Sequence, residues 1–323
     1  MEVVRRNRFF LWAAVAAAVF LMGSVAGAAE FPKDKQIRMV VPYGAGGGVD
    51  ISSRILATAA QDTIGQRVDV VCMPGAGGQE GINFVLQQPH DGHTLLVTDY
   101  GPLVTTALTE EVNYDLSDWM PLVQITEVVP TFFVVSDSPV QDVPTWVKMA
   151  KENPESLSVG HGRHLSVPHL PLILFEKIAG IKNTHVPTTG GSEALAFVLG
   201  KKVDIGSSVP STIASTVKAG TVRPLAVCSL ERVASLPDTP TMKELGYDVV
   251  LPAWYTVFAP KGTPEAALKV LEEKFLEALR SQGAVEMAGK ANVLLTPYGR
   301  DKTVPLYDGT ISNLKKILED VKK

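Results

Sequence analysis

The feature that most constrains the fold is a β-rich run that ends in a glycine loop and continues as a helical pattern. The run 36–43 is followed by four glycines within 44–48, and apolar residues then recur at helical spacing as Ile51, Ile55 and Ala59. Further strand, loop and helix patterns follow in the same order. This alternation predicts an α/β fold of mostly parallel sheets flanked by helices.

Several residues are expected to mark helix ends. Asp50 is the expected N-cap of the first helix and Gly65 its C-terminal stop. The clearest later helical pattern is expected to run from Thr263, as N-cap, to a stop at Gly283. A last helix is expected at about Tyr307–Val321.

The N-terminus has the pattern of a secretory signal peptide. Arginines at positions 5, 6 and 8 precede the apolar run Phe9–Met22, and Ala26-Gly27-Ala28 offers a cleavage site. The apolar run is shorter than the roughly 20 residues that a membrane span needs, although an uncleaved anchor is the alternative. We therefore expect residues 1–28 to be removed, which places the mature protein in the periplasm without stable membrane insertion.

Composition and charge limit the domain number and the partners. The chain has 323 residues, 46% of them hydrophobic, which is enough for two domains of about 150 residues each. The formal net charge is −4, and residues 1–28 contribute three Arg and one Glu, so their removal leaves −6. Such a protein is a poor nucleic-acid binder, and a bound anion must be attracted by local groups.

The two cysteines, Cys72 and Cys228, lie in strand-like apolar runs. A disulfide is one alternative in an oxidising compartment, but nothing in the sequence brings the two runs together, so we expect two separately buried thiols. Their number and spacing exclude a cysteine-based zinc site.

The order of the patterns suggests two domains that the chain crosses twice. We expect domain 1 to comprise residues 30–130 plus 254–323, and domain 2 to comprise residues 131–253. The crossings near Pro130 and Trp254 would act as a hinge. A monomeric clamshell with a cleft between its domains is the expected form.

The glycine loop 44–48 suits an anion, because a helix N-terminus presents unpaired N–H groups and a partial positive charge. A dinucleotide fingerprint fails because Val49 occupies the sixth position, and a P-loop fails because no Lys-Ser/Thr pair follows. Similar turns occur at 74–78 and 188–193, so two loops could face one cleft. A tight turn without a ligand is the alternative.

The segment 160–169 concentrates charge and histidine. Arg163 could clamp a carboxylate with two hydrogen bonds. Zinc ligation by His161, His164 and His169 is an alternative, but the segment holds no cysteine or carboxylate, so we expect no metal and no cofactor. A solvated polar loop is the other alternative.

No catalytic constellation is visible. The motifs G-x-S-x-G and H-E-x-x-H are absent, and Asp50 is better explained as a helix cap than as a general base. We therefore expect a binding protein. The rival functions are a periplasmic enzyme that uses a glycine-loop anion site and a ligand sensor that feeds a signalling membrane protein.

The chain resembles the Bug-type receptors of the tripartite tricarboxylate transporters over nearly its whole mature length. The stretches that carry the resemblance are "FPKDKQIRMVVPYGAGGGVDISSRILA", "GQRVDVVCMPGAGGQEG", "PHDGHTLLV", "THVPTTGGSEALAFVLGKKVDI", "VKAGTVRPLAVCS", "LPDTPTMKELGYDV" and "APKGTPEAALKVLEEKF".

The resemblance implies a periplasmic type II-like clamshell that closes on a small carboxylate and delivers it to integral-membrane permease subunits. It implies that one loop from each domain holds the ligand through amides, polar side chains and ordered water. The implied ligand-binding residues are Tyr43, Ala45, Gly46, Gly47, Gly48, Asp50, His161, Arg163, Ser166, His169, Thr188, Thr189, Gly190 and Asp204.

Two segments depart from the family pattern. The family's serine- and glycine-rich run is replaced here by "GHGRHLSVPH", and its common "PYKGG" appears as Pro187–Gly191, without the aromatic and the lysine. Both departures fall where ligand specificity is expected, so the resemblance names no particular ligand.

Overall fold

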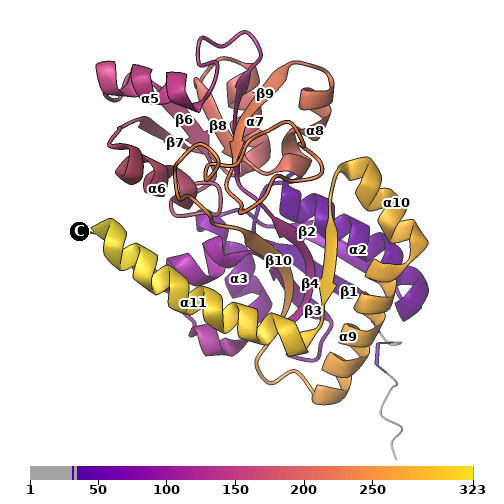
Figure 1. Ribbon diagram of the computed structural model, residues 1–323. Helices are drawn as coiled ribbons and strands as arrows, with labels where there is room; N and C mark the ends of the chain where they lie inside the picture. Colours follow the sequence, from indigo (N-terminus) through magenta and orange to yellow (C-terminus); the bar gives the residue numbers. More distant parts are fainter. Residues whose placement is uncertain (1–30, 33–34, 323) are drawn as a thin grey trace, which may run out of the picture.

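The protein forms two lobes, each a β-sheet flanked by helices (Figure 1). The structure is a computed structural model that describes residues 31–32 and 35–322. The predicted signal peptide, residues 1–28, lies outside the described residues.

The first lobe contains a six-stranded sheet in the order β11-β4-β10-β3-β1-β2. Its strands are β1 (Ile37–Val41), β2 (Val68–Cys72), β3 (Thr94–Thr98), β4 (Trp119–Val128), β10 (Ala253–Pro260) and β11 (Leu295–Tyr298). Its helices are α2 (Gly48–Ile64), α3 (Gln79–Leu86), α4 (Thr106–Thr109), α9 (Glu265–Arg280), α10 (Gln282–Ala291) and α11 (Arg300–Lys322), with short turns of other helix types at Ala76–Gly78, Gly101–Thr105 and Leu116–Asp118.

The second lobe contains a five-stranded sheet in the order β7-β6-β8-β5-β9. Its strands are β5 (Thr131–Val135), β6 (Ser158–His161), β7 (Thr184–Pro187), β8 (Ile205–Ser208) and β9 (Val222–Val227). Its helices are α5 (Val143–Glu152), α6 (Leu170–Ala179), α7 (Gly191–Leu199) and α8 (Pro210–Lys218).

Both sheets are mixed. The pairs β1–β2, β1–β3, β6–β7 and β6–β8 are parallel, while β10 and β5 pair antiparallel with both of their neighbours. Most strands of each sheet still run in one direction, as the alternating pattern predicts. The reversed strands are β10 and β11 in the first sheet and β5 in the second.

The chain passes between the lobes at two neighbouring places. β4 ends at Val128 and β5 begins at Thr131, and on the return β10 begins at Ala253. At the second crossing Trp254 pairs with Glu127 of β4, so the two connections lie side by side.

Each lobe has its own apolar core. In the second lobe Phe132, Trp146 and Phe175 are fully buried and pack through ring contacts. In the first lobe the apolar face of α9 packs on the sheet. Leu165, Val167, Leu170 and Val209 of the second lobe join the first-lobe core, so the two lobes are in direct apolar contact.

Several predicted helix ends are wrong. α2 begins at Gly48 with Gly47 as its N-cap, so Asp50 lies in the first turn and is not the cap. α9 begins after Pro264, and Thr263 donates its hydroxyl to the Pro260 carbonyl instead of capping the helix.

The C-terminal helices also differ from the prediction. The helix predicted to end at Gly283 stops at Arg280, because the Ser281 hydroxyl accepts from Ala284 N–H and begins α10. α11 begins seven residues before the predicted Tyr307, where Glu272 accepts from the Arg300 backbone N–H. The sequence pattern had assigned neither β4 nor β11.

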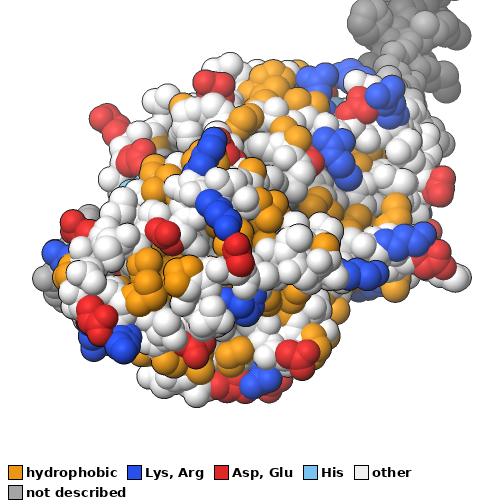
Figure 2. All heavy atoms as spheres, turned by 90° about the horizontal axis from the view of Figure 1, so that it is seen from above, with side chains coloured by type: hydrophobic (Ala, Val, Ile, Leu, Met, Phe, Trp, Pro, Cys, Tyr) orange, Lys and Arg blue, Asp and Glu red, His pale blue; other side chains and the backbone are white. Residues whose placement is uncertain are grey.

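The cysteines are free, as expected. Cys72 belongs to the first sheet and Cys228 follows β9 of the second, and both carry thiols. Within the described residues, no helix combines the length and the apolar character that crossing a membrane requires. On the face drawn in Figure 2, basic and acidic side chains are interspersed and do not gather by sign.

Candidate functional site

A cavity of about 500 Å³ lies between the two lobes. Residues of both lobes line it, and they come mainly from the loops that follow strands. The lining residues are Tyr43, Gly44, Ala45, Gly47, Gly48, Val49, Asp99, Gly162, Ser166, Val167, Pro168, Thr189, Gly190, Gly191, Ser192, Glu193, Ala196, Ser208, Val209, Thr212 and Tyr255.

Three helices begin at this cavity. They are α2 from the first lobe, through Gly48, and α7 and α8 from the second lobe, through Gly191 and Val209. A helix N-terminus carries a partial positive charge and unpaired N–H groups, so each of these ends favours an anion in the cavity. The second-lobe turn of α8 was not among the predicted loops, although Pro210 at the first helical position was a local signal for it.

The glycine loop offers some of its amides but not all of them. Gly46 N–H donates to Asp50 Oδ2 over 2.8 Å, so this amide is paired within the loop. Among the described residues no partner is found for the amides of Gly47 and Gly48, both of which line the cavity. Gly46 adopts a positive φ of 79°, which glycine tolerates and which sets the direction of the amides that follow.

The Asp50 carboxylate is turned away from the cavity. Besides Gly46 N–H it accepts from Arg54 Nε at 2.8 Å and from the Cys72 thiol at 3.3 Å. Burial alone would raise its pKa, but the hydrogen bonds from Arg54 and Gly46 lower it. Asp50 therefore fixes the loop and does not line the cavity.

Three cavity-lining hydroxyls have no hydrogen-bond partner in the described part of the chain. They belong to Ser166, Ser192 and Thr212, and Ser166 is 1% exposed. Since a buried hydroxyl without a partner costs stability, such groups are typical of a site that a ligand or ordered water completes.

A buried carboxylate lies at the first-lobe side of the cavity. Asp99 follows β3 and is 4% exposed. Its oxygens accept from the Tyr43 hydroxyl at 2.8 and 2.9 Å and from Gly101 N–H at 2.6 Å. Burial raises its pKa to about 6. Asp99 was not among the predicted site residues, although a carboxylate directly after an apolar strand is a local signal.

A second carboxylate belongs to α7. Glu193 accepts from Thr189 N–H at 2.7 Å and from the Thr189 hydroxyl at 2.9 Å. These hydrogen bonds lower its pKa and fix the loop before α7. Thr189 and Glu193 thus form a local cap beside the cavity. The Thr189 N–H, which was predicted to bind a ligand, is therefore already hydrogen-bonded to Glu193.

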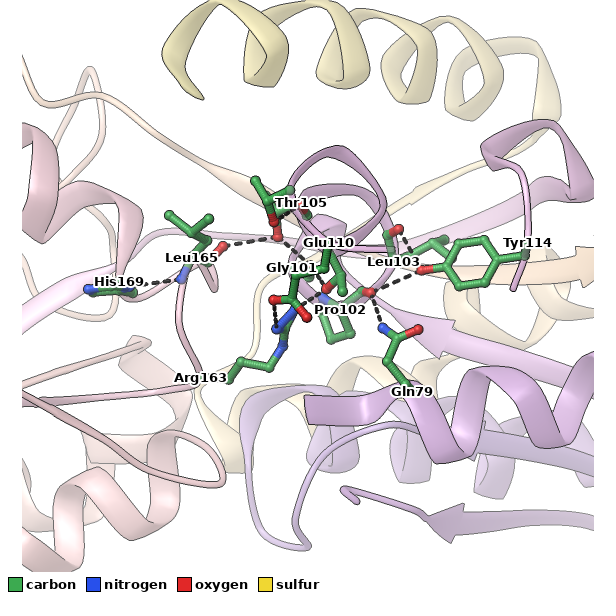
Figure 3. A network of polar contacts seen from close by, with 12 residues as sticks. Gln79, Gly101, Pro102, Leu103, Thr105, Glu110, Tyr114, Arg163, Leu165 and His169 are labelled. Atoms are coloured by element: carbon green, nitrogen blue, oxygen red, sulfur yellow. Dashed lines mark hydrogen bonds and ion pairs between the residues drawn. The ribbon is translucent and has the colours of Figure 1, made fainter. Parts of the chain in front are cut away.

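Arg163 bridges the lobes and does not line this cavity. Its guanidinium donates to the Thr106 hydroxyl. It also lies 3.4 Å from Glu110 Oε1, and both partners belong to the first lobe; Figure 3 labels Arg163 and Glu110. Nearby, the Thr105 hydroxyl donates to the Leu165 carbonyl at 3.1 Å. Arg163 lines an adjoining cavity of about 480 Å³, together with His164 and Thr188.

His161 and His169 are buried behind the loop and line neither cavity. Leu165 N–H donates to His169 Nδ1 at 2.8 Å, so the proton of this ring is on Nε2, which donates to His185 Nδ1 at 2.8 Å. His185 Nε2 in turn donates to Glu176 at 3.0 Å. Burial lowers the pKa of His161 to about 4 and that of His169 to about 2, which keeps both rings neutral.

The zinc alternative named His161, His164 and His169, whereas the structure places His185 beside His161 and His169. His161, His169 and His185 place one nitrogen each within 4.8 Å of the others. A metal would need the lone pair of His169 Nε2, but that nitrogen carries the proton because Nδ1 accepts from Leu165. The arrangement is a structural hydrogen-bond network that places the loop 162–168.

Asp204 does not line the cavity. It is exposed, and its carboxylate accepts from the Ser158 N–H at 2.8 Å and from the Ser158 hydroxyl at 2.6 Å. These contacts join the start of β6 to the segment before β8. The structure therefore gives Asp204 the role of ordering a loop.

The structure brings together half of the predicted site residues. Arg163 and Thr188 line the adjoining cavity, and Gly46, Asp50, His161, His169 and Asp204 line neither. Asp99, Tyr255 and Thr212 line the main cavity without having been predicted. The predicted residues that line it are Tyr43, Ala45, Gly47, Gly48, Ser166, Thr189 and Gly190.

Comparison with known proteins identifies relatives along most of the chain. The family model described as tripartite tricarboxylate transporter family receptor matches residues 52–321. The chain is 33% identical over 261 residues to the UPF0065 protein in the tcbD-tcbE intergenic region of Pseudomonas sp., covering 79% of this chain and 77% of that protein. It is 30% identical over 270 residues to protein BugT of Bordetella pertussis, covering 81% and 83%.

A solved structure supports the same fold. MatC from Rhodopseudomonas palustris, determined with bound malate, superposes with a TM-score of 0.83 at 25% identity. The match covers 89% of this chain and 99% of MatC.

Proposed function

This chain belongs to the tripartite tricarboxylate transporter receptor family, and from that premise we propose that it captures a small carboxylate between its lobes and delivers it to a membrane permease. The family consists of periplasmic solute-binding receptors, and the relative MatC was solved with malate. The proposed solute is a di- or tricarboxylate, an aromatic carboxylate or a similar anion.

The observation that carries the proposal is the convergence of three helix N-termini on one cavity. The cavity has no lining lysine, arginine or histidine among the described residues, so the dipoles and free amides would supply the attraction for a carboxylate. A volume of about 500 Å³ is in the range of small-molecule sites.

The mechanism follows from contacts to both lobes. The lobes, corresponding to residues 30–130 plus 254–323 and to residues 131–253, are proposed to act as domains that hinge at the paired crossings. A ligand that touches Gly48 on one side and Gly190 on the other favours the closed state. The permease then binds the closed, ligand-loaded form of the receptor.

The remaining parts of the proposal follow from the sequence pattern. The protein is exported by a cleavable signal peptide, acts in the periplasm as a monomer, and binds its solute without chemistry, cofactor or metal. Asp99 accepts from Tyr43 and Gly101, and Glu193 accepts from Thr189. Among the described residues, neither carboxylate that lines the cavity is therefore paired with a serine or cysteine nucleophile.

A thermal-shift panel of di- and tricarboxylates, aromatic carboxylates and amino acids tests the proposal. A ligand at a hundredfold excess over its Kd stabilises the folded protein by about 2.7 kcal/mol, which gives a clear rise in Tm. At least one carboxylate should produce such a rise. A flat response to every carboxylate would reject the proposal.

Gly47→Val locates the site. A Cβ at Gly47 would have ordinary contacts, the nearest at 3.6 Å to the Gly44 carbonyl, so the backbone accepts the change. The added methyl groups would occupy cavity space beside Ser192 and block approach to the amides. The variant should lose the ligand response, while its own Tm falls only by the few degrees that the loss of about 1 kcal/mol at the N-cap causes. An undiminished response would place the site elsewhere.

A further inference from the structure

The charges that line the main cavity are all acidic. Its ionisable side chains are Asp99, Glu193 and the phenols Tyr43 and Tyr255. Three helix N-termini favour an anion in the same space, so the cavity combines a positive and a negative potential. A purely anionic solute would be attracted by the helix N-termini but repelled by the carboxylates.

Asp99 is the carboxylate without a compensating cation. Its hydrogen bonds come from Tyr43 and Gly101, and no ion pair to it is found among the described residues. The cation that acts on it electrostatically is Arg163, which is occupied by Thr106 and Glu110 across the lobe boundary. By contrast, Glu193 is committed to the loop before its own helix.

A buried carboxylate that stays charged needs a partner. Burial raises the pKa of Asp99 to about 6, so the group is still largely ionised at neutral pH. Its two donors, the Tyr43 hydroxyl and the Gly101 N–H, make three contacts and leave a lone pair on its oxygens, because a carboxylate accepts up to about four hydrogen bonds. An unpaired buried charge is costly, and a cationic group of the solute would remove that cost.

The cavity also has groups for the rest of a solute. The hydroxyls of Ser166 and Thr212 are buried without a partner among the described residues, and both residues line the cavity. Apolar side chains such as Val167 and Val209 complete the wall. A small molecule that carries one positive charge, one negative charge and a side chain would match the charged, hydroxyl and apolar groups of the cavity.

We propose that the solute of this cavity carries a cationic nitrogen beside its carboxylate, as an amino acid does, and that Asp99 is the residue that selects for it. The inference rests on the proposed function, because the carboxylate of the solute is assigned to the helix N-termini. Asp99 binds the ammonium group, and Tyr43 and Gly101 position the Asp99 carboxylate.

The test compares each amino acid with its counterpart that lacks only the amine. Suitable pairs are aspartate and succinate, glutamate and glutarate, and phenylalanine and 3-phenylpropanoate, measured by isothermal titration calorimetry. At least one amino acid should bind more than about tenfold more tightly than its counterpart. In Asp99→Asn, which keeps the shape and can still accept from Gly101, that ratio should fall by at least about tenfold.

Glu193→Gln is the matched control, because it removes the same charge from the same cavity. It should change the affinities of both members of a pair by a similar factor and keep their ratio. Counterparts that bind as tightly as the amino acids, or a ratio that Asp99→Asn leaves unchanged, would overturn the inference and leave the proposed function standing.

Two other outcomes separate the proposals. In the first, amines without a carboxylate, such as 2-phenylethylamine, bind as well as the amino acids and lose affinity in Asp99→Asn. That result would support the role of Asp99 and reject the proposal that the protein is a carboxylate receptor. If no member of any pair binds but another carboxylate of the thermal-shift panel does, the inference is overturned and the proposed function stands.

Discussion

Gly48 leaves little room for a side chain at the place where the two lobes meet. A Cβ placed there would lie 2.5 Å from the Tyr255 hydroxyl oxygen and 2.8 Å from Cγ2 of Val209. Tyr255 belongs to the first lobe and Val209 to the second, so part of the clash is across the lobe boundary. We predict that Gly48→Ala weakens ligand binding because it resists closure.

The magnitude follows from the overlap. Overpacking of a well-packed region costs about 1–3 kcal/mol. If opening the lobes relieves this cost, closure becomes less favourable by the same amount, which corresponds to a loss of affinity between about fivefold and about 150-fold. Gly47→Ala is the control, because its nearest new contact, 3.6 Å to the Gly44 carbonyl, is ordinary.

The assay is calorimetric titration of both variants with the carboxylate that gives the largest shift in the panel. Affinity is the quantity to compare, because alanine at the N-cap Gly47 also costs the helix about 1 kcal/mol of stability. Gly47→Ala should stay within about twofold of the parent. Equal affinities for Gly48→Ala and the parent would refute the reasoning, since the bound state would then not bring Val209 close to Gly48.

Two further predictions concern buried groups. His161 and His169 have pKa values of about 4 and about 2, below the ordinary 6.5, so only the unfolded state takes up their protons as the pH falls below 6.5. The free energy of unfolding should therefore be highest above pH 6.5 and should fall toward pH 4 by about 1.4 kcal/mol per pH unit for each histidine. Urea unfolding of His161→Phe, repeated at several pH values, should show an unfolding free energy that falls less steeply with decreasing pH, by about that amount. The same pH dependence as in the parent would contradict the assignment. Cys72 and Cys228 should remain thiols, with slow alkylation at pH 8 because burial raises the pKa of Cys72 to about 11 and that of Cys228 further. Mass spectrometry before and after denaturation checks this, and a native mass lower by two hydrogens would show a disulfide.

Local sequence patterns were sufficient for the elements whose signal is local. The run 36–48 predicted strand, loop and helix because glycine content and apolar spacing are written in neighbouring residues. Helix ends were predicted less well, because several residues near a boundary compete for the same amides. Asp50 had the chemistry of a cap, but Gly47 took the position and Asp50 accepted from Gly46 instead.

The site residues divide in the same way. The sequence determined an α/β chain with anion-suited loops at 44–48 and 188–193, because strand-to-loop-to-helix turns are local. Only the tertiary structure decided which groups face the cavity. It turned the polar His161 and Arg163 toward protein partners, and it brought Asp99 from the end of β3 to the lobe boundary. The physical reason is that burial and partner choice depend on contacts between residues far apart in sequence, which no local pattern records.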